Sequence, residues 1–188
     1  MNNDIHHIPW WRVNFSEDDV EKVSESIRNE NISMGSVTEE FENQISRALN
    51  VPYVVATSSG STALLLTMIA LGIKAGDEVI IPNRTWIATA HAPLILGAKP
   101  VLVDVLPDRP VMDTSLIKEK INSRTKAIMP VQLCGCAVEM DEVWKIAREN
   151  NLLVVEDSAQ GFFSSYKNVY MGTQSDAGCF YMSVSKLV

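Results

Sequence analysis

The sequence has few cysteines and no long hydrophobic run, and each shortage excludes a class of protein. Three cysteines among 188 residues do not make a disulfide framework, and Cys134-Gly135-Cys136 has no second cysteine pair to complete a zinc site. No apolar run approaches the roughly 18 residues that a membrane-spanning helix needs. We therefore expect reduced thiols, no metal centre and no membrane partner.

Positive charge is also scarce, and this bears on the partners of the protein. The 16 lysines and arginines are outnumbered by 23 aspartates and glutamates, which leaves a net charge of −7. This balance disfavours nucleic-acid phosphates and anionic membrane surfaces as partners. The N-terminus Met1-Asn2-Asn3-Asp4 lacks the basic and then apolar pattern of a secretion signal, so we predict a cytoplasmic location.

The glycine-rich phosphate loops of nucleotide-binding proteins are absent as well. The turn at 57–62 contains neither Gly-x-Gly-x-x-Gly nor Gly-Lys-Ser/Thr, which argues against a nicotinamide-dependent reductase and a nucleoside triphosphate site. This turn instead consists of small polar residues that lead directly into an apolar helix. Free N–H groups at such a helix start could bind the phosphate of a small cofactor, although ordinary helix capping explains the same residues.

What the sequence does contain is an alternation of short apolar runs and helical segments. Two amphipathic stretches, at 17–29 and 37–49, predict a helical N-terminal arm over residues 1–52. Beyond the arm we predict strands at 53–57, 78–81, 100–103, 127–131, 152–156 and 178–182, and helices at 61–71, 85–96, 115–121 and 140–150. This alternation predicts a three-layer α/β/α fold with a mostly parallel sheet.

Two reactive side chains follow two of the predicted strands. Asp157 ends the run at 152–156, and Lys186 comes just past the run at 178–182. Because the ends of parallel strands lie along one edge of a sheet, the two groups could meet over one ligand. A carboxylate that keeps a pyridine nitrogen protonated and a lysine that condenses with an aldehyde are what pyridoxal phosphate chemistry needs most. Taken singly, Asp157 could merely cap a turn and Lys186 could be an ordinary surface lysine.

An ordered series of motifs extends this pattern over nearly the entire chain. Its members are Phe41-Glu42, Ala56-Thr57-Ser58-Ser59-Gly60-Ser61-Thr62-Ala63-Leu64, Gly76-Asp77-Glu78-Val79-Ile80-Ile81-Pro82, Gly97-Ala98-Lys99-Pro100-Val101, Thr125-Lys126-Ala127-Ile128-Met129-Pro130-Val131 and Glu156-Asp157-Ser158-Ala159-Gln160. The series resembles the DegT/DnrJ/StrS family of sugar-nucleotide aminotransferases, which are pyridoxal phosphate enzymes of fold type I.

The resemblance implies a role for each residue that matches the family pattern. The implied phosphate ligands are Gly60 and Ser61, the ring-stacking aromatic is Trp86, the partner of the pyridine nitrogen is Asp157, the contact on the cofactor oxygen side is Gln160, and the catalytic amine is Lys186. Trp86 could equally pack in the core. Ser61 stands where the family usually has threonine, and Tyr181 stands where a serine commonly holds the phosphate, so either Tyr181 or Ser183 takes that role.

The implied function is transfer of an amino group, with glutamate as donor, to a nucleotide-linked ketosugar in aminosugar and polysaccharide biosynthesis. A lysine at 186 is typical of the aminotransferases, whereas some relatives carry histidine there and act as dehydratases. The resemblance also implies a homodimer.

The resembled family continues through further strands and a small C-terminal domain, whereas only Leu187 and Val188 follow the lysine here. We therefore expect 53–188 to be a partial large domain, without the small domain and with 53–57 lacking a neighbouring strand. The alternative function is that of an inactive remnant, or of one half of a split enzyme that a C-terminal chain completes.

Overall fold

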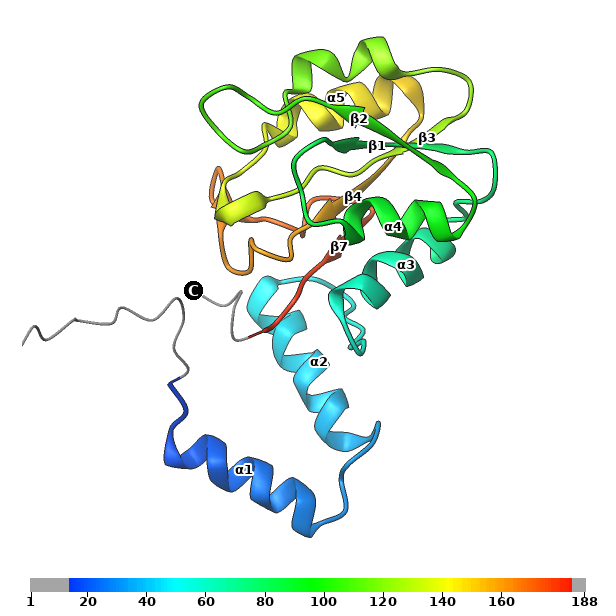
Figure 1. Ribbon diagram of the computed structural model, residues 1–188. Coiled ribbons are helices and arrows are strands. Elements are labelled where there is room, and N and C mark those ends of the chain that lie inside the picture. The colour runs from blue at the N-terminus through cyan, green and yellow to red at the C-terminus, as the bar shows by residue number, and fades with distance from the viewer. Residues whose placement is uncertain (1–13, 184–188) are drawn as a thin grey trace, which may run out of the picture.

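The computed structural model describes residues 14–183 of the chain (Figure 1). Its α-helices are α1 (Glu17–Arg28), α2 (Ser36–Leu49), α3 (Gly60–Ala70), α4 (Ala88–Ile95) and α5 (Met140–Asn150). Its strands are β1 (Glu78–Pro82), β2 (Lys99–Val103), β3 (Thr125–Ile128), β4 (Leu153–Asp157), β5 (Ser165–Tyr166), β6 (Val169–Tyr170) and β7 (Ala177–Cys179). Three short 3-10 helices complete the set: η1 (Thr114–Leu116), η2 (Lys118–Lys120) and η3 (Leu133–Gly135).

The main sheet has five parallel strands in the order β2-β1-β3-β4-β7. The register of β4 on β7 pairs Glu156 with Gly178 and Asp157 with Cys179. All strands run the same way, so their carboxyl ends share one edge. The chain segments that follow the strands are therefore gathered at that edge.

Helices cover both faces of this sheet, as Figure 1 shows. Side chains alternate along each strand: Val79 and Ile81 join the core under α3 and α4, while Ile80 joins the core under α5. Strands with both faces buried are continuous apolar runs, which is what β1 and β4 display. The predicted three-layer α/β/α fold is confirmed.

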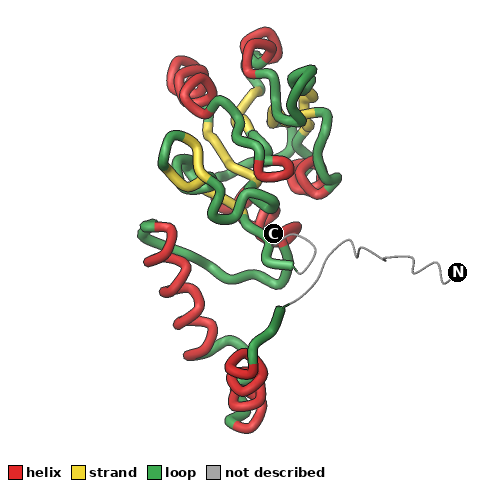
Figure 2. The backbone as a smooth tube through the Cα atoms, turned by 90° about the vertical axis from the view of Figure 1, so that its left-hand side faces the viewer, coloured by secondary structure: helices red, strands yellow, loops and turns green. Residues whose placement is uncertain are grey.

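The two N-terminal helices extend away from these layers (Figure 1 and Figure 2). Helix α1 begins at a capping box, in which the Ser16 hydroxyl accepts from the Asp19 amide and the Asp19 carboxylate accepts from the Ser16 amide. Helix α2 ends at Leu49, and the next residue, Asn50, caps it in the left-handed conformation with φ of 53°. These bounds agree with the predicted helices, and α1 contains no buried residue.

The predicted strand at 53–57 is wrong for this structure, because the segment belongs to neither sheet. Tyr53 and Val55 are 87% and 76% exposed, although the run is apolar. A strand forms only where a neighbouring chain supplies hydrogen-bond partners, and no described segment lies alongside this one as a strand. A hydrogen bond connects this segment to α2: the Ala56 backbone amide donates to the Glu42 carboxylate at 2.7 Å.

Several other predicted boundaries also change. The predicted helix at 115–121 is replaced by η1 and η2, two short turns on either side of the fully buried Ile117. Helix α4 begins at Ala88 rather than at residue 85, and β7 stops at Cys179 rather than at 182. The β5-β6 hairpin was not predicted. It turns through Lys167 and Asn168, whose φ values of 49° and 66° suit a tight two-residue turn.

Within the described residues, no helix is both long and apolar enough to cross a membrane.

Candidate active site at the carboxyl edge of the sheet

A cavity of about 1300 Å³ opens at the carboxyl edge of the sheet. Its walls come from the start of α3, the segments that follow β1, β3 and β4, and the residues that follow β7. In open parallel sheets, ligands bind in crevices at this edge. Five residues that the sequence singled out line the cavity within the described part of the chain: Gly60, Ser61, Trp86, Asp157 and Gln160.

The start of α3 supplies hydrogen-bond donors to the cavity. Ser59 caps this helix by accepting from the Thr62 amide at 3.1 Å, and the Ala63 amide makes the first bond to the carbonyl of Ser59. The amides of Gly60 and Ser61 have no acceptor within residues 14–183. These two N–H groups, together with the positive end of the helix dipole, can bind an anion.

Asp157 is the acidic group of the cavity, and it is only 4% exposed. Its Oδ2 accepts from the Thr89 hydroxyl at 2.7 Å, and its Oδ1 accepts from the Ala159 amide at 3.2 Å. Thr89 is itself fully buried on α4 and contacts the Thr85 hydroxyl at 2.8 Å. These contacts hold a buried carboxylate in one orientation at the floor of the site.

Cys179 pairs with Asp157 across β4 and β7 and also lines the cavity. Burial raises the pKa of the Cys179 thiol to about 11, the bond with Thr67 at 3.3 Å opposes the rise, and the negative charge of Asp157 adds to it. The group is therefore an uncharged thiol near neutral pH. It belongs to the apolar wall and supplies no nucleophile.

Gln160 is oriented by the loop that follows β3. Its Oε1 accepts from the Cys134 amide at 2.8 Å. Because a backbone amide can only donate, the oxygen of the side chain must face Cys134, and the NH₂ group is turned elsewhere. Cys134 makes this bond from a left-handed conformation with φ of 55°, followed by Gly135 at 71°. Gln160 thus presents a donor at the cavity wall.

Aromatic rings form much of the remaining wall. Trp86 lies in the turn after β1 and is 68% exposed, so the structure does not bury it in the core. Tyr181 lies against the start of α3, where a Cβ added to Gly60 would be 3.1 Å from the Tyr181 Cβ. Phe162 and Phe163, with ring centroids 4.2 Å apart, line the cavity on the side of the segment that follows β4.

Two residues that the sequence proposed for the site are not among the described residues that line the cavity. Lys186 lies outside the described residues, so its meeting with Asp157 remains a prediction. Ser183 is half-buried and is not among the residues that line the cavity, whereas Tyr181 is. The sequence reasoning missed Thr89 and Cys134. Thr85 and Thr89 are one helical turn apart after a strand, and this spacing was the available signal for the first of them.

The fold and this cavity define a class of protein: a parallel α/β protein in which a helix start and a buried carboxylate line one cavity at the carboxyl edge of the sheet. The chain belongs to the DegT/DnrJ/EryC1/StrS aminotransferase family, whose family model matches residues 14–187.

Individual relatives agree with this membership. The chain is 38% identical over 177 residues to the GDP-perosamine synthase of Escherichia coli O157:H7, covering 94% of this chain and 49% of that protein. It is 34% identical over 172 residues to the UDP-4-amino-4-deoxy-L-arabinose–oxoglutarate aminotransferase of Shewanella sediminis, covering 92% and 44%. The PLP form of a Streptococcus pneumoniae protein assigned as a sugar aminotransferase superposes with a TM-score of 0.91 at 29% identity, covering 96% and 50%. The chain thus spans about half the length of the relatives it matches.

Proposed function

We propose that this protein binds pyridoxal 5'-phosphate and transfers an amino group to a nucleotide-linked ketosugar. The observation that carries the proposal is that the buried Asp157 lines the same cavity as the start of α3, where Gly60 and Ser61 have amides without an acceptor among residues 14–183. Membership in an aminotransferase family supports it. The names of two relatives supply the substrate class, because they specify GDP- and UDP-linked sugars, and one also specifies oxoglutarate. Glutamate, the amino form of oxoglutarate, is the proposed donor.

The residues of the cavity fit this cofactor. The amides of Gly60 and Ser61, which no described residue accepts from, can bind a phosphate, and Asp157 can hold a proton on a pyridine nitrogen. Trp86 offers an exposed ring for stacking, and Gln160 offers an NH₂ donor for an oxygen substituent of the cofactor ring. The cavity of about 1300 Å³ has room for such a cofactor together with a substrate.

Each residue then has a definite task in the proposed reaction. When bound, pyridoxal phosphate supplies an electron sink for the carbanion that forms on the amino donor. Asp157 keeps the ring nitrogen protonated because its negative charge favours the cationic form. The Lys186 amine moves the proton at the reacting carbon, which is general acid and base catalysis. The apolar wall of Phe162, Phe163 and Cys179 limits access of water to this proton.

The organisation of the protein is part of the proposal. We propose that residues 1–52 serve as an N-terminal arm, which contains α1 and α2, and that 53–188 belong to the cofactor-binding large domain. We further propose a homodimer, and the exposed apolar stripe of Val20, Val23 and Ile27 on α1 supports it.

One observation favours a second candidate, in which the chain acts only with a complementing C-terminal chain. Segment 53–57 and β7 both line a second hollow of about 630 Å³, and among the described residues 53–57 pairs with no strand while β7 pairs only with β4. Such a hollow between two unpaired backbones can accept an added strand. In this reading the isolated chain is an inactive remnant or one half of a split enzyme.

One experiment tests the first candidate and separates it from the second. Pyridoxal phosphate added to the purified protein should give a yellow complex that borohydride traps, and the labelled peptide should contain Lys186. Label on any other residue would overturn the assignment, and the Lys186→Ala variant is the control. Asp157→Asn should retain the fold and lower amino transfer on the order of a hundredfold, because the amide carries no charge.

The amino-transfer assay then discriminates the candidates. Turnover of glutamate and a ketosugar nucleotide by the chain alone would exclude the complementing chain. Cofactor binding without turnover, restored by a second polypeptide, would favour the split enzyme.

A further inference from the structure

Glu156, the residue before Asp157, is fully buried and accepts hydrogen bonds from four different groups. Its Oε2 accepts from the Gln132 side chain at 2.9 Å and from the Gly172 amide at 2.8 Å. Its Oε1 accepts from the Gln174 amide at 3.3 Å and from the Ser175 hydroxyl at 2.5 Å. Successive side chains of a strand point to opposite faces, so Glu156 lies on the other side of β4 from Asp157.

The four donors belong to two segments that both continue into the cavity wall. Gln132 begins the loop after β3, and its own Oε1 accepts from the Val138 amide at 3.0 Å, which closes that loop. The 172–175 turn leads into β7, which is followed by Phe180 and Tyr181 at the cavity. A single carboxylate thus ties both segments to β4.

The 172–175 turn lies in direct contact with β7. A Cβ added to Gly178 would lie 1.9 Å from the Gly172 oxygen, so only glycine fits there. Gly172 has φ of +82°, and a Cβ added to it would lie 2.4 Å from the Phe180 ring. Gly178 is also the register partner of Glu156. Because these groups leave no free space, a shift of the turn must displace β7.

We propose that Glu156 is a positioning residue for the active site. Its carboxylate clamps the 172–175 turn onto β7 and so sets the height at which Phe180 and Tyr181 reach the cavity, with Tyr181 against Gly60. The clamp is a property of the fold, and its effect on cofactor binding rests on the proposed function. Active-site groups must be held within about 0.5 Å of their working positions, so a loosened clamp weakens the site without touching a ligand.

Glu156→Gln is the sharpest variant because it keeps the size of the side chain and changes only its bonding. All four neighbours donate, and an amide turns an N–H group toward at least one of them. Glu78→Gln is the matched control, since Glu78 is another buried carboxylate of the sheet, bonded by Asn122 and Arg124 at the opposite edge. Ser175→Ala is the milder variant, because it removes one donor and leaves the two backbone bonds.

Two measurements test the clamp: amide hydrogen exchange of residues 172–182, and the dissociation constant of pyridoxal phosphate. Glu156→Gln should speed exchange in 172–182 and weaken cofactor binding, each on the order of tenfold, because misplacement by a fraction of an ångström is enough. Ser175→Ala should change both in the same direction by less. Glu78→Gln should leave cofactor binding unchanged, and once its loss of global stability is subtracted it should not speed exchange in 172–182.

Unchanged exchange in both clamp variants would overturn the proposal, as would an equal effect of Glu78→Gln on residues 172–182. If Glu156→Gln fails to fold, Ser175→Ala decides by the same criteria. If the unmutated protein binds no pyridoxal phosphate, the proposed function fails, while the exchange data still decide the clamp.

Discussion

At the scale of single residues, the orientation of Asp157 depends on a hydroxyl from another element. Thr89 donates to the carboxylate from α4, and both side chains are buried. A buried carboxylate that loses a donor keeps its desolvation cost, so the Thr89 hydroxyl contributes to stability as well as to geometry. The acid that defines the site is therefore held in place by a residue 68 positions earlier in the chain.

Replacing Thr89 with valine should show both contributions. Thr89→Val keeps the shape of the side chain and removes the bond to Oδ2, and we expect a loss of about 1–3 kcal/mol in the free energy of unfolding. Cofactor affinity should fall as well, measured by absorbance titration. The control is Thr125→Val, which removes a buried hydroxyl that accepts from the Asn122 backbone amide at 3.0 Å, at the edge of the sheet opposite the cavity. Equal cofactor affinity in the two variants would contradict the role of Thr89.

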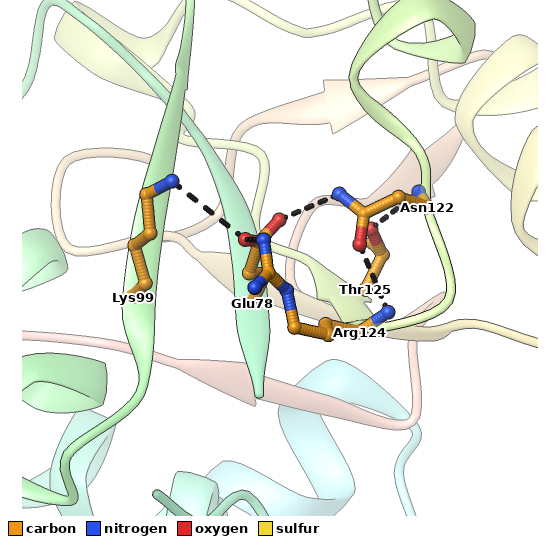
Figure 3. A network of polar contacts seen from close by, with 5 residues as sticks. All are labelled: Glu78, Lys99, Asn122, Arg124 and Thr125. Atoms are coloured by element: carbon orange, nitrogen blue, oxygen red, sulfur yellow. Dashed lines mark hydrogen bonds and ion pairs between the residues drawn. The ribbon is translucent and has the colours of Figure 1, made fainter. Parts of the chain in front are cut away.

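At the scale of elements, a polar network joins the amino ends of β1, β2 and β3 (Figure 3). The Glu78 side chain is 4% exposed, and its carboxylate accepts from the side-chain NH₂ of Asn122 at 2.7 Å. The same carboxylate forms ion pairs with Arg124 at 2.7 Å and Lys99 at 3.7 Å. The bond from Asn122 lowers the pKa of the Glu78 carboxyl below its ordinary value of 4.5, and the charges of Arg124 and Lys99 lower it further against the opposing effect of burial. The network therefore stabilises the edge of the sheet opposite the cavity.

The sign of the pKa shift gives a prediction about pH. Because the folded pKa of Glu78 is lower than the unfolded one, its contribution to stability is complete above pH 4.5 and is lost as the pH falls through the folded pKa. Glu78→Gln should therefore cost about 1–2 kcal/mol at pH 7 and progressively less under acid conditions. Denaturant unfolding across this range measures the difference between the two proteins. A difference that stays constant down to the lowest pH would show that the charge of Glu78 is not the cause.

At the scale of the whole molecule, the N-terminal arm exposes an apolar stripe. Val20, Val23 and Ile27 share one face of α1, and each is more than half exposed. Figure 2 shows this helix lying apart from the layered body. A stripe of this kind is the signature of a surface that another chain covers, and in our proposal the second copy of the protein covers it.

The arm can be tested by its effect on association. A variant with both Val23→Gln and Ile27→Gln should weaken self-association by about a hundredfold or more, because each of the two buried aliphatic side chains contributes roughly 1.5 kcal/mol or more. Sedimentation velocity over a concentration series measures the effect, and circular dichroism checks that α1 persists. Glu25→Gln, on the opposite face, is the matched control and should leave association unchanged. Dimers of equal strength in all three proteins would remove α1 from the interface.

Local patterns were sufficient for most elements, and they indicated several residues that line the cavity. The capping box at Ser16 and the apolar runs of β1 and β4 are short-range signals, and the corresponding elements formed where they were expected. Gly60, Trp86, Asp157 and Gln160 were expected at strand ends or helix starts, and the cavity contains all four. The prediction of a strand at 53–57 was wrong because a strand also needs a neighbouring strand, and the residues of one segment do not specify its neighbour.

The sequence alone therefore determined the α/β alternation, the parallel sheet and the chemical character of the strand ends, because these depend on residues close together in the chain. Only the tertiary structure decided which distant groups meet: Thr89 with Asp157, Cys134 with Gln160, and the 172–175 turn with Glu156. The physical reason is that such bonds depend on the register of strands and on the packing of helices, and these are set by the sum of many weak contacts over the whole fold.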